Sequence, residues 1–565
     1  MRLVRLYHTI RHLKWRQIFG QLSRRVFSFR HDPSRWKRYL PPPFPGTEIK
    51  LSSSTLAPNV GRNSHPRILA GEFEFLNTPL NLGFPPTWIP PTSAGKLWHY
   101  NLHYFDWIHT LPFENAKQVT SNWFEANVPR KGAVSWDPYP TSLRCLNWAL
   151  YFFLSHDEQT NLDPGFRSQI WANIARQMEY LSRNLETHLL GNHILENAAT
   201  LAFLGTLFKG EIAQNWKRIG CRELSTQIPE QILPDGLHFE ASPMYHLRVV
   251  YLLSLLQSIE GNDLKSLTTV PLASSVKALK DVLHPDGNIA LLNDSAIGIY
   301  HDPKTLLRFA GSALAKHQNP EQTTHSPRHS NSWSLESAGY YGYRDDSGNY
   351  IICDAGPIGP DYIPGHAHAD IFTYELSLKG CRVIVDTGNF DYLESPSRSL
   401  SRSTKAHNTV EIDGTDQCDM WGAFRVGQRV SPREVQFEHK PLGFRLSASH
   451  EGYNRHPSRA IHKRAFEVSH PFRIRVADEV SAPNPVSART YIHLTPECSI
   501  IRFEEQEVTV QYPKGTFTIR FQGQGRLTMT TTNYFPEFGV ALRRTTICYT
   551  TKNRHSVTSH TITPT

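Results

Sequence analysis

Residues 163–185, DPGFRSQIWANIARQMEYLSRNL, carry the pattern that decides the fold class of the N-terminal half. Apolar residues recur there at intervals of three or four, which places them on one face of a long helix. They are Phe166, Ile170, Ile174, Met178, Leu181 and Leu185. Asp163-Pro164 supplies the start signal of this helix.

Similar helical patterns lie on both sides of this stretch. They cover residues 142–155, 193–208, 213–228, 243–259 and 272–283. Loops that contain Pro and Gly separate them. We see no crossover strands between these segments, which argues against a doubly wound sheet. Residues 96–325 therefore predict an α/α layered or toroidal domain.

After about residue 335 the apolar period changes from helical spacing to two. Strand patterns cover residues 349–353, 372–378, 382–386, 408–412, 465–468, 472–476 and 515–521. Many short strands with turn signals between them predict a β-sandwich over residues 335–565. Residues 316–334, rich in His, Asn, Ser, Pro and Thr, are the expected linker. The chain is thus predicted to be an α+β multidomain protein.

Residues 1–95 differ from both predicted domains. Residues 1–40 alternate basic and apolar positions at helical spacing, which predicts an amphipathic helix with a basic face. Two interpretations stay open: a helix docked on the main body, and a helix at a membrane surface. Pro41-Pro42-Pro43 ends any helix. Residues 41–95, rich in Pro, Ser and Asn, predict an irregular connector.

The N-terminus lacks the uninterrupted apolar core and the cleavage site of a secretory signal. No apolar run reaches the roughly eighteen residues that a transmembrane helix needs. We therefore expect no transmembrane segment and a cytoplasmic protein by default, with the periplasm or secretion as the alternative. The seven Cys residues contain no CxxC pair, which argues against a disulfide framework or a Cys-rich zinc module.

The composition excludes several classes of protein. Aromatic residues make up 11% of the chain, which rules out wholesale disorder. Lys and Arg number 60 against 51 Asp and Glu, a net charge of +9. Such a chain attracts polyanions, among which nucleic acid, a membrane face and an acidic polysaccharide are candidates. We expect no nucleic-acid partner, because no recognised nucleic-acid module is present.

Two motifs in the helical half carry candidate chemistry. In residues 191–197, GNHILEN, Asn192 is a good N-cap, and His193 and Glu196 are spaced to face one way. The positive end of a helix there would accept an anionic group. The alternative is a capped helix with a surface Glu–His pair. In residues 235–246, Tyr245 is either a structural Tyr or a proton carrier.

A third motif, PGHAHAD at residues 364–370, opens the β domain. In a strand, His366 and His368 would share a face. Asp386 ends an apolar strand eighteen residues after His368, and His407 follows twenty-one residues later. Two imidazoles and one carboxylate can bind zinc. The alternative is a set of unrelated polar residues at strand ends.

Taken together, these motifs resemble the heparinase II/III-type polysaccharide lyases. The resemblance runs in order from about residue 96 to 430. It rests on three motifs: Asn-His-x-x-Glu, Tyr after Ser-Pro-x, and Gly-His-x-His-x-Asp. It also includes residues 136–140 (WDPYP) with Arg144, Asn147-Trp148, residues 386–388 (DTG) and residues 406–409 (AHNT). It implies an incomplete α/α toroid followed by an antiparallel β-sandwich, in agreement with the periodicity.

The resemblance also implies β-elimination at a uronic acid of an acidic polysaccharide. Asn192 and His193 would neutralise the C6 carboxylate, with Glu196 orienting His193. Tyr245 would protonate the O4 leaving group and His366 would remove the C5 proton, although Tyr245 could do both.

The remaining residues carried over from the resemblance hold substrate or metal. Tyr139, Arg144 and Arg402 would bind substrate; Arg398 is expected to be an ordinary surface charge. His368, Asp386 and His407 would bind a mainly structural Zn²⁺ that pins the loop presenting His366.

Two other functions stay open beside elimination. A glycoside hydrolase would need two carboxylates at the bond, for which Glu196, Glu240 and Asp235 are available. A non-catalytic protein that binds acidic glycans is the other. A homodimer is compatible with either function.

Overall fold

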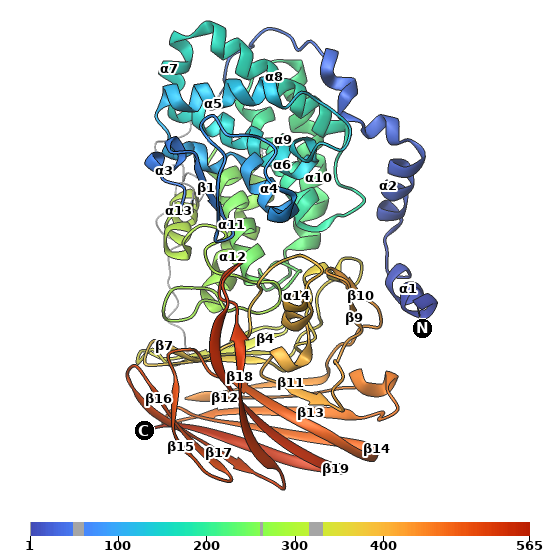
Figure 1. Ribbon diagram of the computed structural model, residues 1–565, viewed down its shortest axis with the longest axis vertical. Helices are drawn as coiled ribbons and strands as arrows, with labels where there is room; N and C mark the ends of the chain where they lie inside the picture. Colours follow the sequence, from blue (N-terminus) through green and yellow to red (C-terminus); the bar gives the residue numbers. More distant parts are fainter. Residues whose placement is uncertain (1, 49–60, 260–263, 316–330) are drawn as a thin grey trace.

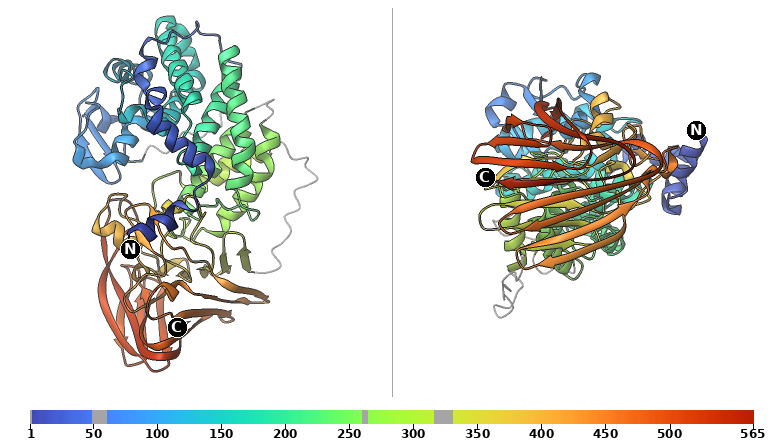
Figure 2. Two further views of the ribbon diagram at one scale, coloured as in Figure 1. Left: turned by 90° about the vertical axis from the view of Figure 1, so that its right-hand side faces the viewer. Right: turned by 90° about the horizontal axis from the view of Figure 1, so that it is seen from below.

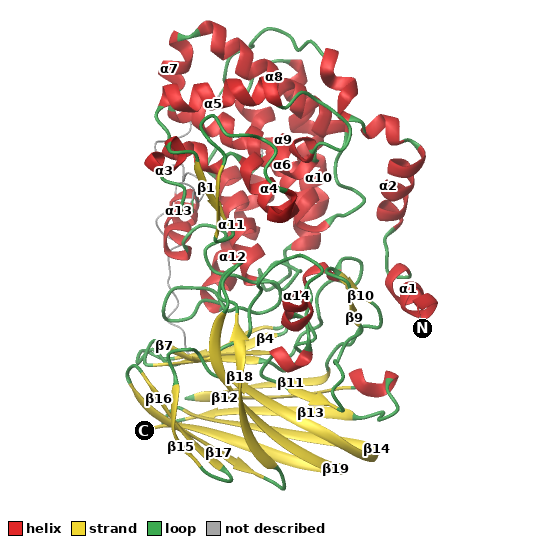
Figure 3. Cartoon of the chain, viewed as in Figure 1, coloured by secondary structure: helices red, strands yellow, loops and turns green. Residues whose placement is uncertain are grey.

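The structure is a computed structural model that describes residues 2–48, 61–259, 264–315 and 331–565. Helices make up one half of the molecule and antiparallel sheets the other (Figures 1 and 3). The predicted fold, an α/α toroid followed by a β-sandwich, is confirmed. Within the described residues no helix is both long and apolar enough to cross a membrane.

The helical half is built from packed hairpins of antiparallel neighbours. Its helices are α4 (Gly95–Tyr104), α5 (Phe113–Ala126), α6 (Pro138–Trp148), α7 (Asp157–Leu162), α8 (Pro164–Arg183), α9 (Gly191–Leu207), α10 (Glu211–Gln231), α11 (Pro243–Gln257), α12 (Lys265–Asp281) and α13 (Pro303–Ala315). The predicted start signal of α8 is real, because Asp163 accepts a hydrogen bond from the Phe166 backbone N at 3.0 Å. Ser242 caps α11 through the backbone N of Tyr245.

The other half contains two antiparallel sheets. A five-stranded sheet has the order β3 (Ser332–Leu335), β4 (Tyr340–Arg344), β5 (Tyr350–Asp354), β6 (Tyr374–Leu378) and β7 (Cys381–Ile384). A ten-stranded sheet runs through β11 (Arg433–Lys440), β12 (Gly443–His450), β13 (Ile461–Ser469), β14 (Arg473–His493), β19 (Leu542–Pro564), β17 (Gly515–Gln522), β16 (Glu507–Tyr512) and β15 (Ser499–Phe503), with β8 (Val410–Ile412) on β14 and β18 (Arg526–Tyr534) on β19.

The five-stranded sheet lies between the helices and the large sheet. Tyr350 and Ile352 of β5 belong to the core of the helical half, whereas Ile351 and Cys353 belong to the core of the sandwich. Successive side chains of a strand point to opposite faces, so both faces of β5 are covered. Because both cores pack on this sheet, the loops of the sandwich are held close to the first turns of the helices in the other half.

Three local predictions were wrong. Residues 41–95 contain the helix α3 (His65–Leu69) and a hairpin of β1 (Glu72–Phe75) and β2 (Thr78–Asn81), closed by Leu76 and Asn77 with positive φ. Of the predicted linker, residues 316–330 lie outside the described residues, and 332–334 pair in β3. The 364–370 motif is not a strand, because Pro364–His366 forms one turn of 3-10 helix.

The N-terminal segment forms α1 (Arg2–Ile10) and α2 (Trp15–Val26) rather than one helix. The two helices follow one side of the molecule, with α1 beside the sandwich and α2 beside the helical half (Figure 2).

Candidate active site

A cavity of about 460 Å³ lies where the first turns of three helices meet the loops of the sandwich. Tyr139 comes from α6, Asn192 and His193 from α9, and Tyr245 from α11. His366 enters from the sandwich side. The structure thus brings together five of the residues predicted from the sequence.

The start of α9 is held in an unusual backbone conformation. Leu190 and Gly191 have φ of 67° and 59°. The positive φ of Gly191 favours glycine, and a Cβ there would also lie 2.5 Å from Glu240 Oε1. The backbone N of Asn192 donates to the same Glu240 oxygen at 3.2 Å. The turn therefore directs the Asn192 and His193 side chains into the cavity.

His193 is oriented by Glu186 and not by Glu196. His193 Nδ1 lies 3.1 Å from Glu186 Oε1. Glu196 instead pairs with Arg248 of α11, accepting from its Nε at 2.8 Å and its Nη2 at 2.6 Å. The predicted role of Glu196 is wrong because that carboxylate is already bound in the helical core.

Glu186 favours the charged form of His193. Burial opposes ionisation of the imidazole, but the carboxylate outweighs it and raises the pKa of His193 above its ordinary value. A cationic His193 at the N-terminus of α9 suits an anionic substrate group.

We expect Glu186→Gln to move the alkaline limb of the kcat/KM pH profile to lower pH by about one unit or more. A raised pKa keeps His193 charged to higher pH, and burial without the carboxylate lowers that pKa. The profile is measured on the purified chain with a cleavable glycan. Glu114→Gln, an exposed change on α5, is the control. An unshifted profile would show that the charge of His193 does not matter.

The rings of Tyr245 and His366 lie against each other in the lining of the cavity. Their ring centroids lie 4.2 Å apart. The Tyr245 and Tyr392 hydroxyl oxygens are 2.9 Å apart. Burial, reinforced by Tyr392, raises the pKa of Tyr245 well above its ordinary value. Tyr245 is therefore protonated at neutral pH, as a proton donor must be.

A buried carboxylate, Asp294, holds His366. Its Oδ2 lies 2.8 Å from His366 Nδ1, and its Oδ1 lies 2.8 Å from His368 Nε2. Arg398 Nη2 donates to Oδ2 at 2.8 Å, and Arg398 Nη1 donates to Oδ1. A carboxylate on Nδ1 places the ring proton there and leaves Nε2 to accept a proton. Glu240 Oε2 lies 3.6 Å from that Nε2.

Asp294, like Glu186 and Tyr392, is a residue of the candidate site that the sequence interpretation missed. Burial opposes its ionisation, but Arg398 and the two imidazoles outweigh burial and hold the pKa of Asp294 well below its ordinary range. The one available signal was the pair Asn293-Asp294 directly after the apolar run 289–292.

The structure does not bring two predicted substrate-binding arginines to the cavity. Arg144 is fully buried in the helical core, where it donates to Gln177 Oε1 and the His103 carbonyl. Arg402 is also buried and donates to three backbone carbonyls. Arg398, expected at the surface, is 1% exposed and paired with Asp294. All three guanidinium groups are occupied by protein acceptors.

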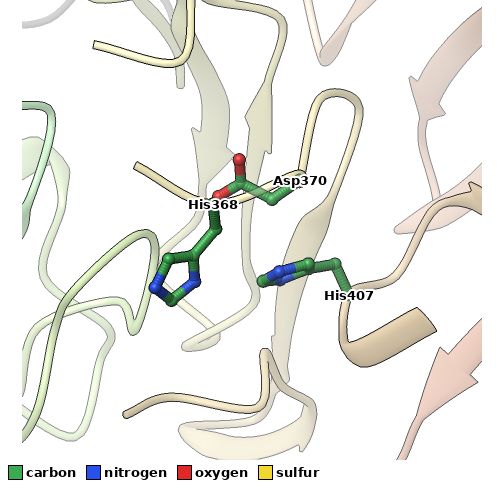
Figure 4. A group of neighbouring side chains, drawn as sticks. All are labelled: His368, Asp370 and His407. Carbon is green, nitrogen blue, oxygen red and sulfur yellow. The ribbon is translucent and has the colours of Figure 1, made fainter. Parts of the chain in front are cut away.

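His368, Asp370 and His407 form a buried group, with one candidate ligand atom from each within 4.8 Å of the others (Figure 4). Three of their buried polar atoms have no hydrogen-bond partner among the described residues: His368 Nδ1, Asp370 Oδ2 and His407 Nε2. Buried polar atoms are normally paired. Two imidazoles and a carboxylate with unpaired atoms fit a divalent metal such as zinc.

Asp386, predicted as a ligand, lies on the other nitrogen of His407. Its two oxygens are 3.0 and 2.8 Å from His407 Nδ1. Asp370 takes its place in the group of three. A carboxylate on the second nitrogen of a ligating imidazole is the usual way in which such a ring is oriented.

Comparisons with known proteins agree with this arrangement. The sequence profile of the heparinase II/III N-terminus matches residues 95–301, and that of the heparinase II/III-like C-terminal region matches residues 327–562. A heparin-sulfate lyase of Pedobacter heparinus is 26% identical over 268 residues, which are 44% of this chain and 40% of that protein. One of Bacteroides thetaiotaomicron is 28% identical over 236 residues, 36% of this chain and 33% of that protein.

The chain thus spans well under half the length of these curated relatives. A crystal structure of heparinase III superposes with a TM-score of 0.72, covering 94% of this chain and 88% of that one at 17% identity. At this identity the likeness concerns the fold.

Proposed function

Because the chain belongs to the heparinase II/III-like family, we propose that it is a polysaccharide lyase that cleaves an acidic, uronate-containing polysaccharide by β-elimination. The observation that carries the proposal is the facing pair of Tyr245 and His366, 4.2 Å apart between ring centroids, beside the start of α9. Relatives described as heparin-sulfate lyases support a glycosaminoglycan as the substrate.

The proposed chemistry assigns each group one task. Asn192 and His193 neutralise the C6 carboxylate, which makes the C5 proton more acidic and stabilises the charge that develops when it leaves. His366 Nε2 takes the C5 proton, because Asp294 occupies Nδ1. Tyr245 donates its proton to O4 as the glycosidic bond breaks. The products are a new C4–C5 double bond and a free hydroxyl on the departing sugar.

The geometry disfavours a glycoside hydrolase. Such an enzyme needs two carboxyl groups that flank the scissile bond. Glu196 is bound by Arg248, and Asp235 accepts from the backbone N atoms of Leu237 and Ala338. Glu240 is buried beneath the cavity lining, where it accepts from the backbone N of Asn192. Among the described lining residues of the cavity, Asp391 is the one carboxylate, and it accepts from Ser395 Oγ and the Leu393 backbone N.

The charge of the cavity indicates a substrate with few sulfates. Lys96 is its one Lys or Arg among the described lining residues, and Lys96 Nζ pairs with Asp137 at 2.9 Å. The adjoining cavity is lined by Glu74, Asp106, Asp302 and Glu537 and by one arginine, Arg62, which pairs with Glu74 at 3.0 Å and with Glu537 at 3.6 Å. The described lining of the two cavities therefore offers a sulfate no unpaired Lys or Arg.

We expect an unsulfated uronate glycan to be cleaved with a kcat/KM at least about tenfold above that for heparin, because each sulfate would enter the cavity without a cationic partner and a loss of about 1.4 kcal/mol is tenfold. Initial rates on matched backbones that differ in sulfation measure this. A kcat/KM that rises with sulfate content would contradict the assignment and leave elimination itself untouched.

A structural Zn²⁺ belongs to the proposal. His368, His407 and Asp370 would hold it, with Asp386 orienting His407. The unpaired buried atoms of the three ligands support this. When bound, the ion supplies a fixed positive charge that restrains residues 364–370, the segment that presents His366.

We expect the purified chain to contain about one zinc per molecule. Asp370→Asn should abolish binding, whereas Asp386→Asn should weaken it by about 10–100-fold. Elemental analysis and titration with a chelator give both results, and the Tm should fall with metal removal. If Asp386→Asn loses the metal and Asp370→Asn keeps it, the carboxylate assignment is reversed.

The proposed activity is tested by ultraviolet absorbance. Heparin, heparan sulfate, chondroitin, hyaluronan and alginate are incubated with the full chain, and the C4–C5 double bond is followed. Absorbance that rises with at least one glycan is expected. New reducing ends without absorbance would favour hydrolysis instead.

A further inference from the structure

The N-terminal helices are docked on the molecule by their polar edges. In α1, Arg5 pairs with Asp419 at 2.7 Å, and the Thr9 hydroxyl donates to the Val426 carbonyl at 3.3 Å. Arg429 of the sandwich donates to the His8 carbonyl at 2.9 Å. Through these contacts, the polar side of α1 faces the sandwich.

The polar edge of α2 faces the helical half in the same way. Gln17 is 3% exposed and donates to the carbonyls of Leu189 and Tyr362. A Cβ on Gly20 would lie 2.8 Å from the His188 backbone N, so the helix packs closely at that point. A helix on the surface of a globular protein normally buries its apolar side. Here the apolar side is left outside.

The outward side of both helices is an apolar stripe. In α2 it consists of Trp15, Phe19, Leu22 and Val26, which are 75%, 66%, 50% and 67% exposed. Their spacing of three and four residues places them in one row. Tyr7 of α1 is 63% exposed. An apolar stripe that is not covered by the protein marks an interaction surface.

Positive charge accompanies this stripe. Residues 1–31 contain eight Lys or Arg and no Asp or Glu. Arg11, Arg25 and Arg30 are exposed. A second copy of the chain on the stripe would bring these arginines against their equivalents, which is unfavourable. An anionic surface is complementary to them.

We propose that α1 and α2 dock the protein on an anionic lipid bilayer, with the apolar stripe in the interface between headgroups and acyl chains. Exposed Trp and Phe beside Arg are the features of helices that lie in the plane of a membrane. Both helices stand on one side of the molecule (Figure 2). The bilayer would therefore contact the protein along a line that spans both domains.

The test is sedimentation of the full chain with phosphatidylglycerol-containing vesicles and with pure phosphatidylcholine vesicles. We expect binding to the anionic vesicles, weaker binding to the neutral ones, and weakening by salt. Trp15→Ser/Phe19→Ser/Leu22→Ser should lower the partition coefficient at least about tenfold. The matched control, Leu162→Ser/Val270→Ser/Ile501→Ser, removes three other exposed apolar side chains and should bind as the unmodified chain does.

Three results would overturn the proposal. In the first, the unmodified chain does not sediment with the anionic vesicles. In the second, the two triple variants bind these vesicles equally. In the third, analytical ultracentrifugation shows a dimer that the stripe variant dissociates, which would make the stripe an interface between copies. Circular dichroism confirms that each variant is folded.

Discussion

Tyr245→Phe should lower kcat by about 10²–10⁴ and leave the fold intact. The substitution removes the hydroxyl that donates to O4 and keeps the ring that packs beside His366. KM should change little, since the lost proton transfer occurs in the transition state.

A matched control separates this effect from the loss of any buried hydroxyl. Tyr151 donates to the Leu111 carbonyl at 2.6 Å in the helical core, and it does not line the cavity. Tyr151→Phe should cost about 1 kcal/mol of stability and keep kcat within a factor of two or so. Steady-state rates and thermal unfolding of both variants decide the matter. Equal kcat for Tyr245→Phe and the unmodified chain would remove Tyr245 from the mechanism.

Asp294→Asn should have the largest effect on stability. Asp294 and Arg398 are 0% and 1% exposed by side chain, and the carboxylate also accepts from two imidazoles. Removing one partner of a buried ion pair costs about 3–5 kcal/mol. The same change frees Nδ1 of His366, so kcat should fall as well. Denaturant unfolding and steady-state kinetics measure the two losses separately.

The pH dependence gives this prediction a second readout. The pKa of Asp294 is depressed in the folded chain. Its contribution to stability is therefore present above the unfolded pKa of about 4 and is lost as pH falls toward the folded value. Asp294→Asn should remove that part of the acid destabilisation. The exposed pair of Arg5 and Asp419 is the control, where Asp419→Asn should cost less than about 1 kcal/mol. A similarly small loss for Asp294→Asn would contradict the ion-pair account.

Local periodicity was enough to predict α6 and α8 to α12 of the helical half and seven strands of the other half, which is fewer than half of the described elements. Residues 163–185 predicted α8 and its cap because an amphipathic helix repeats its apolar residues at a spacing that one sequence shows. The hairpin β1–β2 escaped because its strands have four residues each and its turn uses Leu76 and Asn77 rather than glycine. Short strands joined by a turn without glycine or proline leave little trace in a sequence.

The candidate site could be predicted only in part, because several of its contacts join residues that are far apart in the sequence. Glu196 lies three residues after His193 on α9, a spacing that lets the two side chains meet. Its carboxylate is instead paired with Arg248, fifty-two residues further along the chain. Asp294 meets His366 across seventy-two residues, and no motif surrounds it. Sequence spacing shows which face of a helix a residue occupies, but it does not show which residue from another segment contacts it.

Product masses after reaction in heavy-oxygen water distinguish elimination from hydrolysis. The full chain is incubated with a size-defined uronate oligosaccharide, and the two products are weighed. Elimination adds no water, so we expect the two masses to add up to that of the substrate, with no heavy oxygen in either product. A pair that together exceeds the substrate by one water, with the heavy oxygen in one product, would show hydrolysis and contradict it.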